Sequence, residues 1–552
     1  MSEPIDTLVK RAEFLFGKRR PLLPFWQEIS ENFLPMRAQF TRQFYLSEQF
    51  ADRILTSYPL MVQRDLGNAI SAMLRPREQE WFQARIEGWE SLDKTSKAWL
   101  QWATGVQKRA MYDRHSQFVR ATREGDQDYA AFGQTAITRE MDMAERRLLY
   151  RCWHLKDTVW AETYNGSIGE IYRYWYPTRQ EVCKLFPKTV SPNVKSQLAN
   201  DPHVEVKCMH VVVSGEDYDR VPLPGGDKPP KYRTPWVSCY IDVENKVVLQ
   251  ENASYSRIYT LPRWATVSGS AFAYSPAAVA GLPDGRLLQA MTLTLMEAGE
   301  MSVRPPLVAA QDVVRSDVSI YAGGITWVDA EYDERLGEAL RPLITTSGEG
   351  LKHGFEMIKD AREQLAEAFY LNKLALPPPD RDMTAYETGQ RIQEWIRQAL
   401  PLFEPMEVEY NGVLCDDTFE ALMRVGAFGS QADIPSPLRG KQVKFTFESP
   451  LHQATDRKKG ALFLQAGQML TEAMQLDPTN AFQVDAVTAL RDALEGIGVP
   501  ATWMRDPKVA QQMADAKAKQ DAIAHGTNTV LAGAQAAQAL GEASKTLGGA
   551  PA

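Results

Sequence analysis

Cysteine and histidine are scarce in this chain, whose 552 residues include 5 cysteines and 7 histidines. No two cysteines form a Cys-x-x-Cys pair, and no two histidines lie one helical turn apart. This pattern excludes a disulfide framework and argues against a zinc site. We therefore expect reduced thiols, as in a cytosolic compartment, and neither a metal nor another cofactor.

Long apolar runs are also missing, since no stretch approaches the 18 or so uninterrupted apolar residues that a membrane helix needs. The N-terminus has no basic segment followed by an apolar core, so the sequence predicts no signal peptide. We expect a soluble protein without a membrane partner.

The sequence patterns of common enzymes are absent as well. The segment Gly17-Lys18-Arg19 lacks the leading glycine and the hydroxyl of a phosphate-binding loop, and no zinc-protease, nucleophile-elbow or dinucleotide pattern occurs. The sequence therefore favours a protein that is not an enzyme.

Two carboxylate pairs are candidate sites. Asp416 and Asp417 could act together, but adjacent residues do not face each other on a helix, so a solvated helix face or a helix start is favoured. Asp126 and Asp128 suggest a calcium loop but lack its remaining ligands and its terminal glutamate.

The chain is acidic, with a net charge of −8. This charge argues against a surface that coats nucleic acid generally, but a local basic ring remains compatible with an acidic body.

The most informative pattern that is present is a helix, an insert and a second helix. Apolar periodicity predicts helices over Pro283–Met301 and Gly350–Leu371, with a strand-rich insert between them. A proline-stiffened loop with basic residues follows over 372–383, and a capping box at Thr384 starts a long helix. Such an arrangement suits an elongated spoke better than an enzyme core.

The second of these helices has a narrow apolar stripe. The stripe consists of Leu351, Phe355, Ile358, Leu365 and Phe369.

The rest of the chain alternates between helical and β patterns. Residues 1–150 are expected to be mainly helical, including Gln49–Leu74, kinked or split at Pro59, and Ser116–Met143. Residues 151–280 are β-rich, with strands in Val204–Val213 and Trp236–Gln250. A return strand at Gln442–Glu448 precedes further helices, so the predicted class is α+β and mainly helical.

Several segments, in order along the chain, resemble the head-to-tail connector or portal proteins of short-tailed bacteriophages. The resemblance covers roughly residues 10–430 and rests on collinear short patterns rather than on one motif. The segments are Ala69–Phe82 with its Trp-Phe end, Arg123–Gly133, Gly169–Trp175, Leu261–Gln289 and Met383–Arg391.

The resemblance implies a portal-type architecture. Its parts would be a wing (1–280), a stem helix (281–301), a small α/β clip (302–346), a second stem helix (347–371), a tunnel loop (372–383), a long wing helix with a return strand (384–450) and a C-terminal helical crown or barrel (451–552). The clip would have strands around Leu307–Val314 and Gly324–Val328, and the apolar stripe of the second stem helix would pack in the stem.

The resemblance also implies a dodecameric ring at one capsid vertex of the virion, made in the host bacterial cytoplasm, through which the genome is packaged and ejected. Its partners would be double-stranded DNA, the terminase large subunit, tail adaptor proteins, and capsid and scaffolding proteins. The clip would dock partners through Arg304, Arg315 and Trp327.

The charge pattern is compatible with a DNA channel. A dodecamer of this chain carries a formal charge of roughly −100, which would repel a stationary duplex. Asn372, Lys373 and Arg381 in the tunnel loop would face the DNA, and the two cations would centre it without holding it. An ordinary exposed loop between helices is the alternative.

Two other functions remain open. One is a different virion component, such as a tail or internal head protein, which would not form wide rings. The other is a nucleic-acid-processing enzyme of the packaging machinery, which the missing phosphate loop and carboxylate cluster disfavour.

Overall fold

The computed structural model describes most of the chain in separate stretches. The described residues are 3–43, 54–77, 79–89, 92–142, 147–215, 218, 234–303, 307–309, 340–342, 348–374, 401, 406–430, 432–447, 450–476, 484–496, 499, 503–505, 509–510, 512–513 and 515–517.

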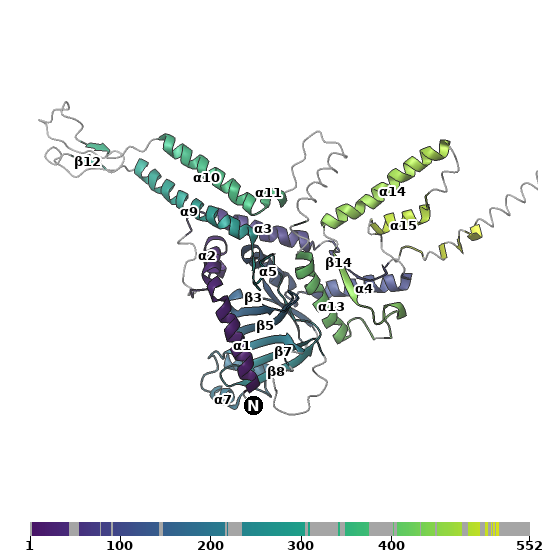
Figure 1. The fold of residues 1–552 in the computed structure, drawn as a ribbon, viewed down its shortest axis with the longest axis horizontal. Helices are drawn as coiled ribbons and strands as arrows, with labels where there is room; N and C mark the ends of the chain where they lie inside the picture. The colour runs from purple at the N-terminus through teal and green to yellow at the C-terminus, as the bar shows by residue number, and fades with distance from the viewer. Residues whose placement is uncertain are drawn as a thin grey trace, which may run out of the picture. The chain divides into compact units, whose positions relative to one another are not determined.

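The chain divides into two compact units, which are described separately. Unit 1 comprises Met1–Phe82, Val106–Phe428 and Phe447–Leu451, and unit 2 comprises Gln83–Gly105, Gly429–Thr446 and His452–Ala552. The two units contain all the helices and strands labelled in Figure 1.

Unit 1 begins with helices. They are α1 (Glu3–Arg19), α2 (Leu23–Phe33), α3 (Tyr58–Leu74) and α5 (Phe118–Phe132), with 3₁₀ turns η1 (Arg20–Leu22) and η2 (Pro35–Arg37). Helix α3 starts at Tyr58 with Pro59 in its first turn, a position where a missing N–H costs nothing. Of the two alternatives for Pro59, the kink is wrong, and the described part of the predicted run is helical only from Tyr58 onward.

A five-stranded antiparallel sheet forms the centre of unit 1, in the order β4-β5-β6-β7-β8. Its strands are β4 (Thr158–Glu162), β5 (Ile168–Trp175), β6 (Cys208–Ser214), β7 (Trp236–Asp242) and β8 (Val247–Ser254). The buried Asp242 accepts hydrogen bonds from the backbone amides of Glu244 and Asn245, which fixes the β7–β8 turn. The strands predicted in this region are confirmed.

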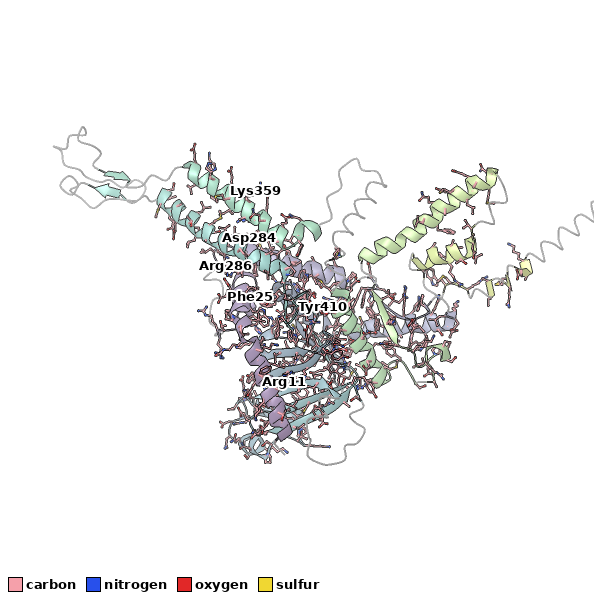
Figure 2. The ribbon with its side chains drawn as sticks, viewed as in Figure 1. Arg11, Phe25, Asp284, Arg286, Lys359 and Tyr410 are labelled. Atoms are coloured by element: carbon pink, nitrogen blue, oxygen red, sulfur yellow. The ribbon has the colours of Figure 1, made fainter. Side chains whose placement is uncertain are left out.

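Helix α1 is bound to this sheet by polar and aromatic contacts. Arg11 pairs with Glu170 of β5 at 3.0 Å, and the rings of Phe16 and Tyr174 stack 4.7 Å apart. The labelled Arg11 lies where α1 crosses the strands (Figure 2).

A three-stranded antiparallel sheet has the order β3-β2-β9. Its strands are β2 (Ala136–Asp142), β3 (Arg147–Trp153) and β9 (Tyr259–Thr260). The predicted helix Ser116–Met143 is therefore wrong beyond Phe132, because Gly133 ends α5 with a left-handed backbone (φ 74°). A Cβ on Gly133 would lie 2.2 Å from the carbonyl carbon of Tyr274, so no other residue fits there.

Smaller elements complete this part of unit 1. They are the 3₁₀ turn η4 (Leu155–Asp157), helices α6 (Arg179–Leu185) and α7 (Pro192–Gln197), and the paired strands β10 (Ala265–Thr266) and β11 (Ala273–Tyr274). A capping box at Thr178 and Glu181 starts α6, and the buried Val182 and Val194 bring both helices into one hydrophobic cluster with Leu249.

Two long helices follow, α9 (Pro276–Val303) and α10 (Gly348–Ala368), and then the short α11 (Leu371–Leu374). Helix α9 starts seven residues before the predicted Pro283 because Ser275 caps it. The Ser275 hydroxyl accepts from the amide of Ala278 and donates to the carbonyl of Ala130 at 2.6 Å. Pro283 lies inside α9, where it removes one backbone hydrogen bond without ending the helix.

Between these helices the structure describes one pair of strands, β12 (Leu307–Ala309) and β13 (Leu340–Pro342), which run antiparallel. Strand β12 falls within the first strand predicted for the insert. The second, Gly324–Val328, lies outside the described residues, and so does the capping box at Thr384.

The last described part of unit 1 is a π-helix, η7 (Glu407–Gly412), which continues into α13 (Val413–Val425). Asp417 of α13 is buried, which raises the pKa of its carboxyl to about 7, whereas Asp416 is exposed. The solvated-face interpretation therefore fails for Asp417, whereas Asp416 lies in the first turn of α13, in agreement with a helix start.

Unit 2 contains a two-stranded sheet of β1 (Phe82–Ile86) and β14 (Val443–Phe447), which confirms the predicted return strand. A small core joins Leu100 of α4 (Lys94–Met111) to Ala84 and to Leu438 of the 3₁₀ turn η8 (Ser436–Leu438). Helices α14 (Pro450–Leu476) and α15 (Ala486–Gly496) follow.

The molecule thus mixes helices with several small sheets, and the predicted α+β class is confirmed at this level. Residues 1–150 contain strands β1 and β2 and the start of β3 as well as helices. The sequence prediction missed β1 because its pairing partner, β14, is distant in the sequence. It missed β2 and β3 because the predicted helix was continued past Gly133, which ends α5.

Candidate functional site: a stem hairpin and its anchors

The antiparallel pair of α9 and α10 forms a hairpin that we call the stem (Figure 1). Gly281 near the start of α9 faces Phe369 just beyond the end of α10, and Gly354 near the start of α10 faces Leu295. A Cβ on either glycine would lie 2.5 Å from the facing side chain. The two glycines therefore allow the helices to approach closely at both ends of the hairpin.

The base of the stem is buried against α2. Leu365 and Phe369 are fully buried, and the Phe369 ring lies 5.0 Å from the ring of Phe33 at an angle of 50°. An ion pair between Arg286 and Glu28 adds a polar contact at the same end (Figure 2). Tyr370 then adopts a left-handed backbone (φ 58°) and ends the helix before α11.

The distal part of the stem is largely exposed. No residue of α9 beyond Leu288 is buried in the described structure, although the helix remains apolar there. The exposed apolar side chains of this part are Leu293, Met296, Met301, Val303, Phe355 and Met357.

The predicted stripe on α10 divides between these two regions. Ile358, Leu365 and Phe369 are buried, Leu351 is half-buried, and Phe355 is 64% exposed. Lys359 lies on the exposed side of α10 and pairs with Glu363 at 3.9 Å (Figure 2). Phe355 therefore contributes little to the packing of a single chain.

The predicted tunnel loop begins at the end of the stem. Asn372 is exposed and belongs, with the backbone of Lys373, to helix α11 rather than to a loop. The side chain of Lys373 and all of Arg381 lie outside the described residues. The clip residues Arg304, Arg315 and Trp327 do so as well.

The π-helix η7 follows in the described chain, and buried polar contacts hold it against the rest of unit 1. The side chain of Asn411 accepts from Arg75 Nη1 at 2.8 Å and donates to the carbonyl of Leu74 at 3.1 Å. Such one-turn π-helices recur at functional sites. In this chain the π-helical turn contains Glu409 and Asn411 and leads directly into helix α13.

Arg75 is the centre of a buried ion pair. Its guanidinium contacts the carboxylate of Asp126 and lies 4.5 Å from the centroid of the Tyr410 ring. Burial is the largest influence on the pKa of Arg75 and acts to lower it. The charge and hydrogen bond of Asp126, together with Tyr410 and Tyr112, raise the pKa by more, so it ends above its usual value. Arg37 pairs in the same way with buried Asp128 at 3.0 Å. Asp126 and Asp128, which suggested a calcium loop in the sequence, are therefore ion-pair partners of Arg75 and Arg37.

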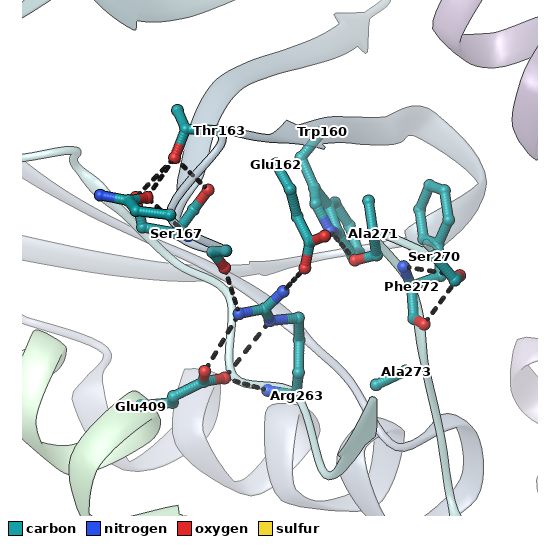
Figure 3. A network of polar contacts seen from close by, with 12 residues as sticks. Trp160, Glu162, Thr163, Ser167, Arg263, Ser270, Ala271, Phe272, Ala273 and Glu409 are labelled. Carbon is teal, nitrogen blue, oxygen red and sulfur yellow. Dashed lines mark hydrogen bonds and ion pairs between the residues drawn. The ribbon is translucent and has the colours of Figure 1, made fainter. Parts of the chain in front are cut away.

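A second cluster holds Glu409 of η7 (Figure 3). Arg263 Nη2 lies 3.1 Å from Glu409 Oε1, and the backbone amide of Arg263 donates to Glu409 Oε2 at 3.1 Å. The same guanidinium pairs with Glu162 and donates to the carbonyl of Gly166 at 3.0 Å. One arginine thus joins η7 to both ends of the β4–β5 turn.

These contacts place anchors on both sides of residues 375–405. The chain enters from the buried base of the stem and leaves into a π-helix with two buried arginine contacts. Both described ends of this segment are therefore fixed to buried parts of unit 1.

Neither a metal cluster nor a membrane helix is found in the part of the chain that the structure describes. No three of its histidine, cysteine or acidic side chains are grouped to bind a metal, and none of its helices is long and apolar enough to cross a bilayer.

A family model of the bacteriophage head to tail connecting protein matches residues 6–504. The chain belongs to this connector family. A protein of Bordetella phage BPP-1 named "Probable portal protein" is 25% identical over 459 residues, which cover 81% of this chain and 79% of that relative. A "Portal protein" of Salmonella phage epsilon15 is 20% identical over 547 residues, which cover 97% of this chain and 95% of that relative.

The resemblance to connector proteins that the sequence suggested is confirmed by this family match. The sequence did not reveal the anchors of this connector-family chain, namely Arg75, Arg263, Glu409 and Asn411. No local pattern marks them, since charged residues such as Arg77 and Glu407 lie within two positions of Arg75 and Glu409.

Proposed function

We propose that this chain is a virion structural protein that forms a dodecameric portal ring at one capsid vertex. The ring would be the conduit for packaging and ejection of double-stranded DNA. It would also be the docking site for the terminase large subunit and tail adaptors, with capsid and scaffolding proteins around it. It would have no enzymatic activity.

The exposed apolar side chains of the distal stem are the observation that carries this proposal. A monomer would leave them in water, whereas apolar surface of this extent on one element is typical of an interaction site. In a closed ring each stem meets two neighbours through different faces, so the apolar distal half of both helices would be covered.

The proposed parts follow the described elements. The wing would comprise the two sheets and helices α1 to α7, the stem α9 and α10, and the clip the segment closed by β12 and β13. The tunnel loop would begin at α11 and the crown would contain α14 and α15. Negative-stain images of the purified protein test the proposal. Rings with a central channel are expected, and compact monomers at high concentration would contradict it.

Replacing Phe355 by serine is expected to weaken ring assembly while leaving the fold intact. An exposed side chain changes the free energy of unfolding by no more than about 0.5 kcal/mol, so the melting temperature of the subunit should stay the same. Analytical ultracentrifugation should show rings dissociating at higher protein concentration than in the parent.

Phe14→Ser is the matched control, because Phe14 is an equally exposed aromatic residue on α1 rather than on the stem. Equal ring stability in the Phe355 variant and the parent would remove this part of the stem from the subunit contact.

Reversing two charges of the proposed tunnel loop is expected to spare assembly and impair DNA handling. In the double variant Lys373→Glu/Arg381→Glu, the cations that would centre the DNA are replaced by groups that repel phosphates. Rings should form normally, while the yield of DNA-filled heads in an infection or packaging assay should fall at least about tenfold, the factor for 1.4 kcal/mol.

Reversal of two exposed wing lysines, Lys184 and Lys195, provides the control with the same net charge change. If the loop variant packages and retains a genome as well as this control, the loop is not a charged constriction.

The alternatives have distinct outcomes. A tail or internal head protein would give no wide rings, and a packaging enzyme would show ATPase or nuclease activity. The exposed stem favours neither of them over a portal ring.

A further inference from the structure

A cleft of about 630 Å³ opens between the three-stranded and the five-stranded sheets of unit 1. Its described lining shares no residue with the stem or its anchors. The floor contains Arg173, His210 and Ser238, the walls include Trp153 and Tyr240, and the rim carries further polar and basic side chains. The rim side chains are Arg139, Glu140, Arg151, Gln250, Asn252 and Arg424.

A chain of hydrogen bonds crosses the floor of this cleft in one direction. Arg173 Nε donates to the hydroxyl oxygen of Tyr259 at 2.8 Å. That hydroxyl lies 2.6 Å from His210 Nδ1, and His210 Nε2 lies 2.8 Å from the hydroxyl of Ser238. An arginine can only donate, so Tyr259 accepts from it. The positive charge of Arg173 favours the tautomer in which His210 presents the lone pair of Nδ1, and not an N–H, on this side, so the Tyr259 hydroxyl donates to Nδ1. His210 then carries its hydrogen on Nε2 and donates to Ser238.

The neutral state of His210 agrees with this direction. Burial, followed by the charge of Arg173, lowers the pKa of His210 well below its usual value. Its ring also stacks on Tyr240 with centroids 4.1 Å apart, so its orientation is fixed. The chain of donors therefore ends at the Ser238 hydroxyl hydrogen, which has no acceptor among the described residues.

The other end of the chain also presents an unused donor. Arg173 is 1% exposed, and its Nη1 has no hydrogen-bond partner in the part of the molecule that the structure describes. Its guanidinium lies 3.5 Å from the centroid of the Trp153 ring. No carboxylate of the described chain forms an ion pair with Arg173, although buried charges normally have one.

We propose that the cleft binds a phosphate group, either free or as part of a small phosphate ester. Arg173 Nη1 and the Ser238 hydroxyl, two donors without acceptors at the floor, would both be satisfied by a ligand that only accepts. Arg139 and Arg151 add positive charge around it, whereas Arg424 is paired with Glu420 at 3.2 Å, and donors from several directions suit a tetrahedral oxyanion. Glu140 also lines the cleft, but its carboxylate already accepts from the hydroxyl of Tyr240 at 3.0 Å. The volume is in the range of small-ligand sites, so it leaves room for an ester.

Thermal unfolding of the full chain in inorganic phosphate, against chloride of equal ionic strength, tests this site. Phosphate is expected to raise the melting temperature of the parent in a saturable way. Arg173→Met should abolish that response without lowering the melting temperature in chloride, because it removes an unpaired buried cation. If Arg173 only stabilised the fold, Arg173→Met would lower the melting temperature in chloride and leave the phosphate response unchanged.

Two further variants sharpen the experiment. Ser238→Ala should weaken phosphate binding about tenfold, the loss typical of one hydrogen bond to a charged group. Arg179→Met is the control, because Arg179 pairs with Asp201 outside the cleft, and it should keep the full phosphate response. An equal response in the Arg173 variant and the parent would overturn the proposal. Tighter binding of acetate or glutarate than of phosphate would also overturn it.

The source of the phosphate is decided by comparing two ligands by titration calorimetry. Tighter binding of adenosine monophosphate than of inorganic phosphate would assign an ester, and the reverse would assign the free ion. If neither ligand binds, the phosphate proposal fails and the ring proposal stands, because the cleft and the stem share no described residue.

Discussion

Replacing Arg75 by methionine is expected to lower the free energy of unfolding by about 3–5 kcal/mol, the usual cost of removing one partner of a buried ion pair. Asp126 would be left charged and fully buried, with only polar neighbours. Asn411 would lose the donor that holds the π-helix η7 in place. Urea unfolding followed by circular dichroism measures the loss.

The pH dependence of this variant provides an internal check. Burial raises the pKa of Asp126 and Arg75 opposes that rise, so the pKa should climb further once Arg75 is gone. Protonation makes the carboxyl neutral, so the stability deficit should be smaller at about pH 5 than at about pH 8. A deficit that grows as the pH falls would contradict the assignment of an orphaned carboxylate.

Two comparisons isolate the buried pair. Arg64→Met removes an exposed arginine that pairs with Asp65 and should cost no more than about 1 kcal/mol. The double variant Arg75→Met/Asp126→Leu removes both charges and should recover most of the loss, because apolar replacements of a buried pair are often neutral. A double variant as unstable as the single one would show that packing, not charge, dominates at this site.

Phe369→Ala is expected to cost about 3–5 kcal/mol, because a buried aromatic side chain leaves a large cavity when truncated. The ring fills the space between Gly281 and Phe33, where α9, α10 and α2 meet. The base of the stem should therefore loosen, and amide exchange of α9 and α10 should accelerate more than that of the five-stranded sheet.

A second substitution tests the geometry directly. Gly281→Ala should destabilise the parent, since its Cβ would lie 2.5 Å from Phe369 Cε2, but should be tolerated in the Phe369→Ala background. Phe355→Ala serves as the control on the exposed side of α10 and should cost no more than about 0.5 kcal/mol. Equal costs of Gly281→Ala in both backgrounds would mean that the two residues do not limit the helix spacing.

The sequence predicted the elements whose signal is local. Apolar periodicity gave both stem helices, and β-branched runs gave β6, β7 and β8. Boundaries set by single residues were harder. Ser275 starts α9 and Gly133 ends α5, yet each resembles an ordinary loop residue until its partner across the fold is known.

The anchors of the candidate site could not be predicted, because they join distant positions. Arg75 and Asp126 are 51 residues apart, and Arg263 and Glu409 are 146 apart. Asp126 even suggested a fragment of a calcium loop, since one sequence carries no sign of which arginine neutralises a carboxylate. Local patterns describe helices and strands, whereas long-range charge pairing depends on the finished fold.

The pairing of β12 with β13 has a consequence for how this family can diversify. Ala309 lies opposite Leu340, so the two ends of residues 310–339 are held one strand spacing apart. The described chain therefore leaves and re-enters this region at one place. We expect residues 310–339 to tolerate replacement by a segment of another length, because β12 and β13 fix both of its ends.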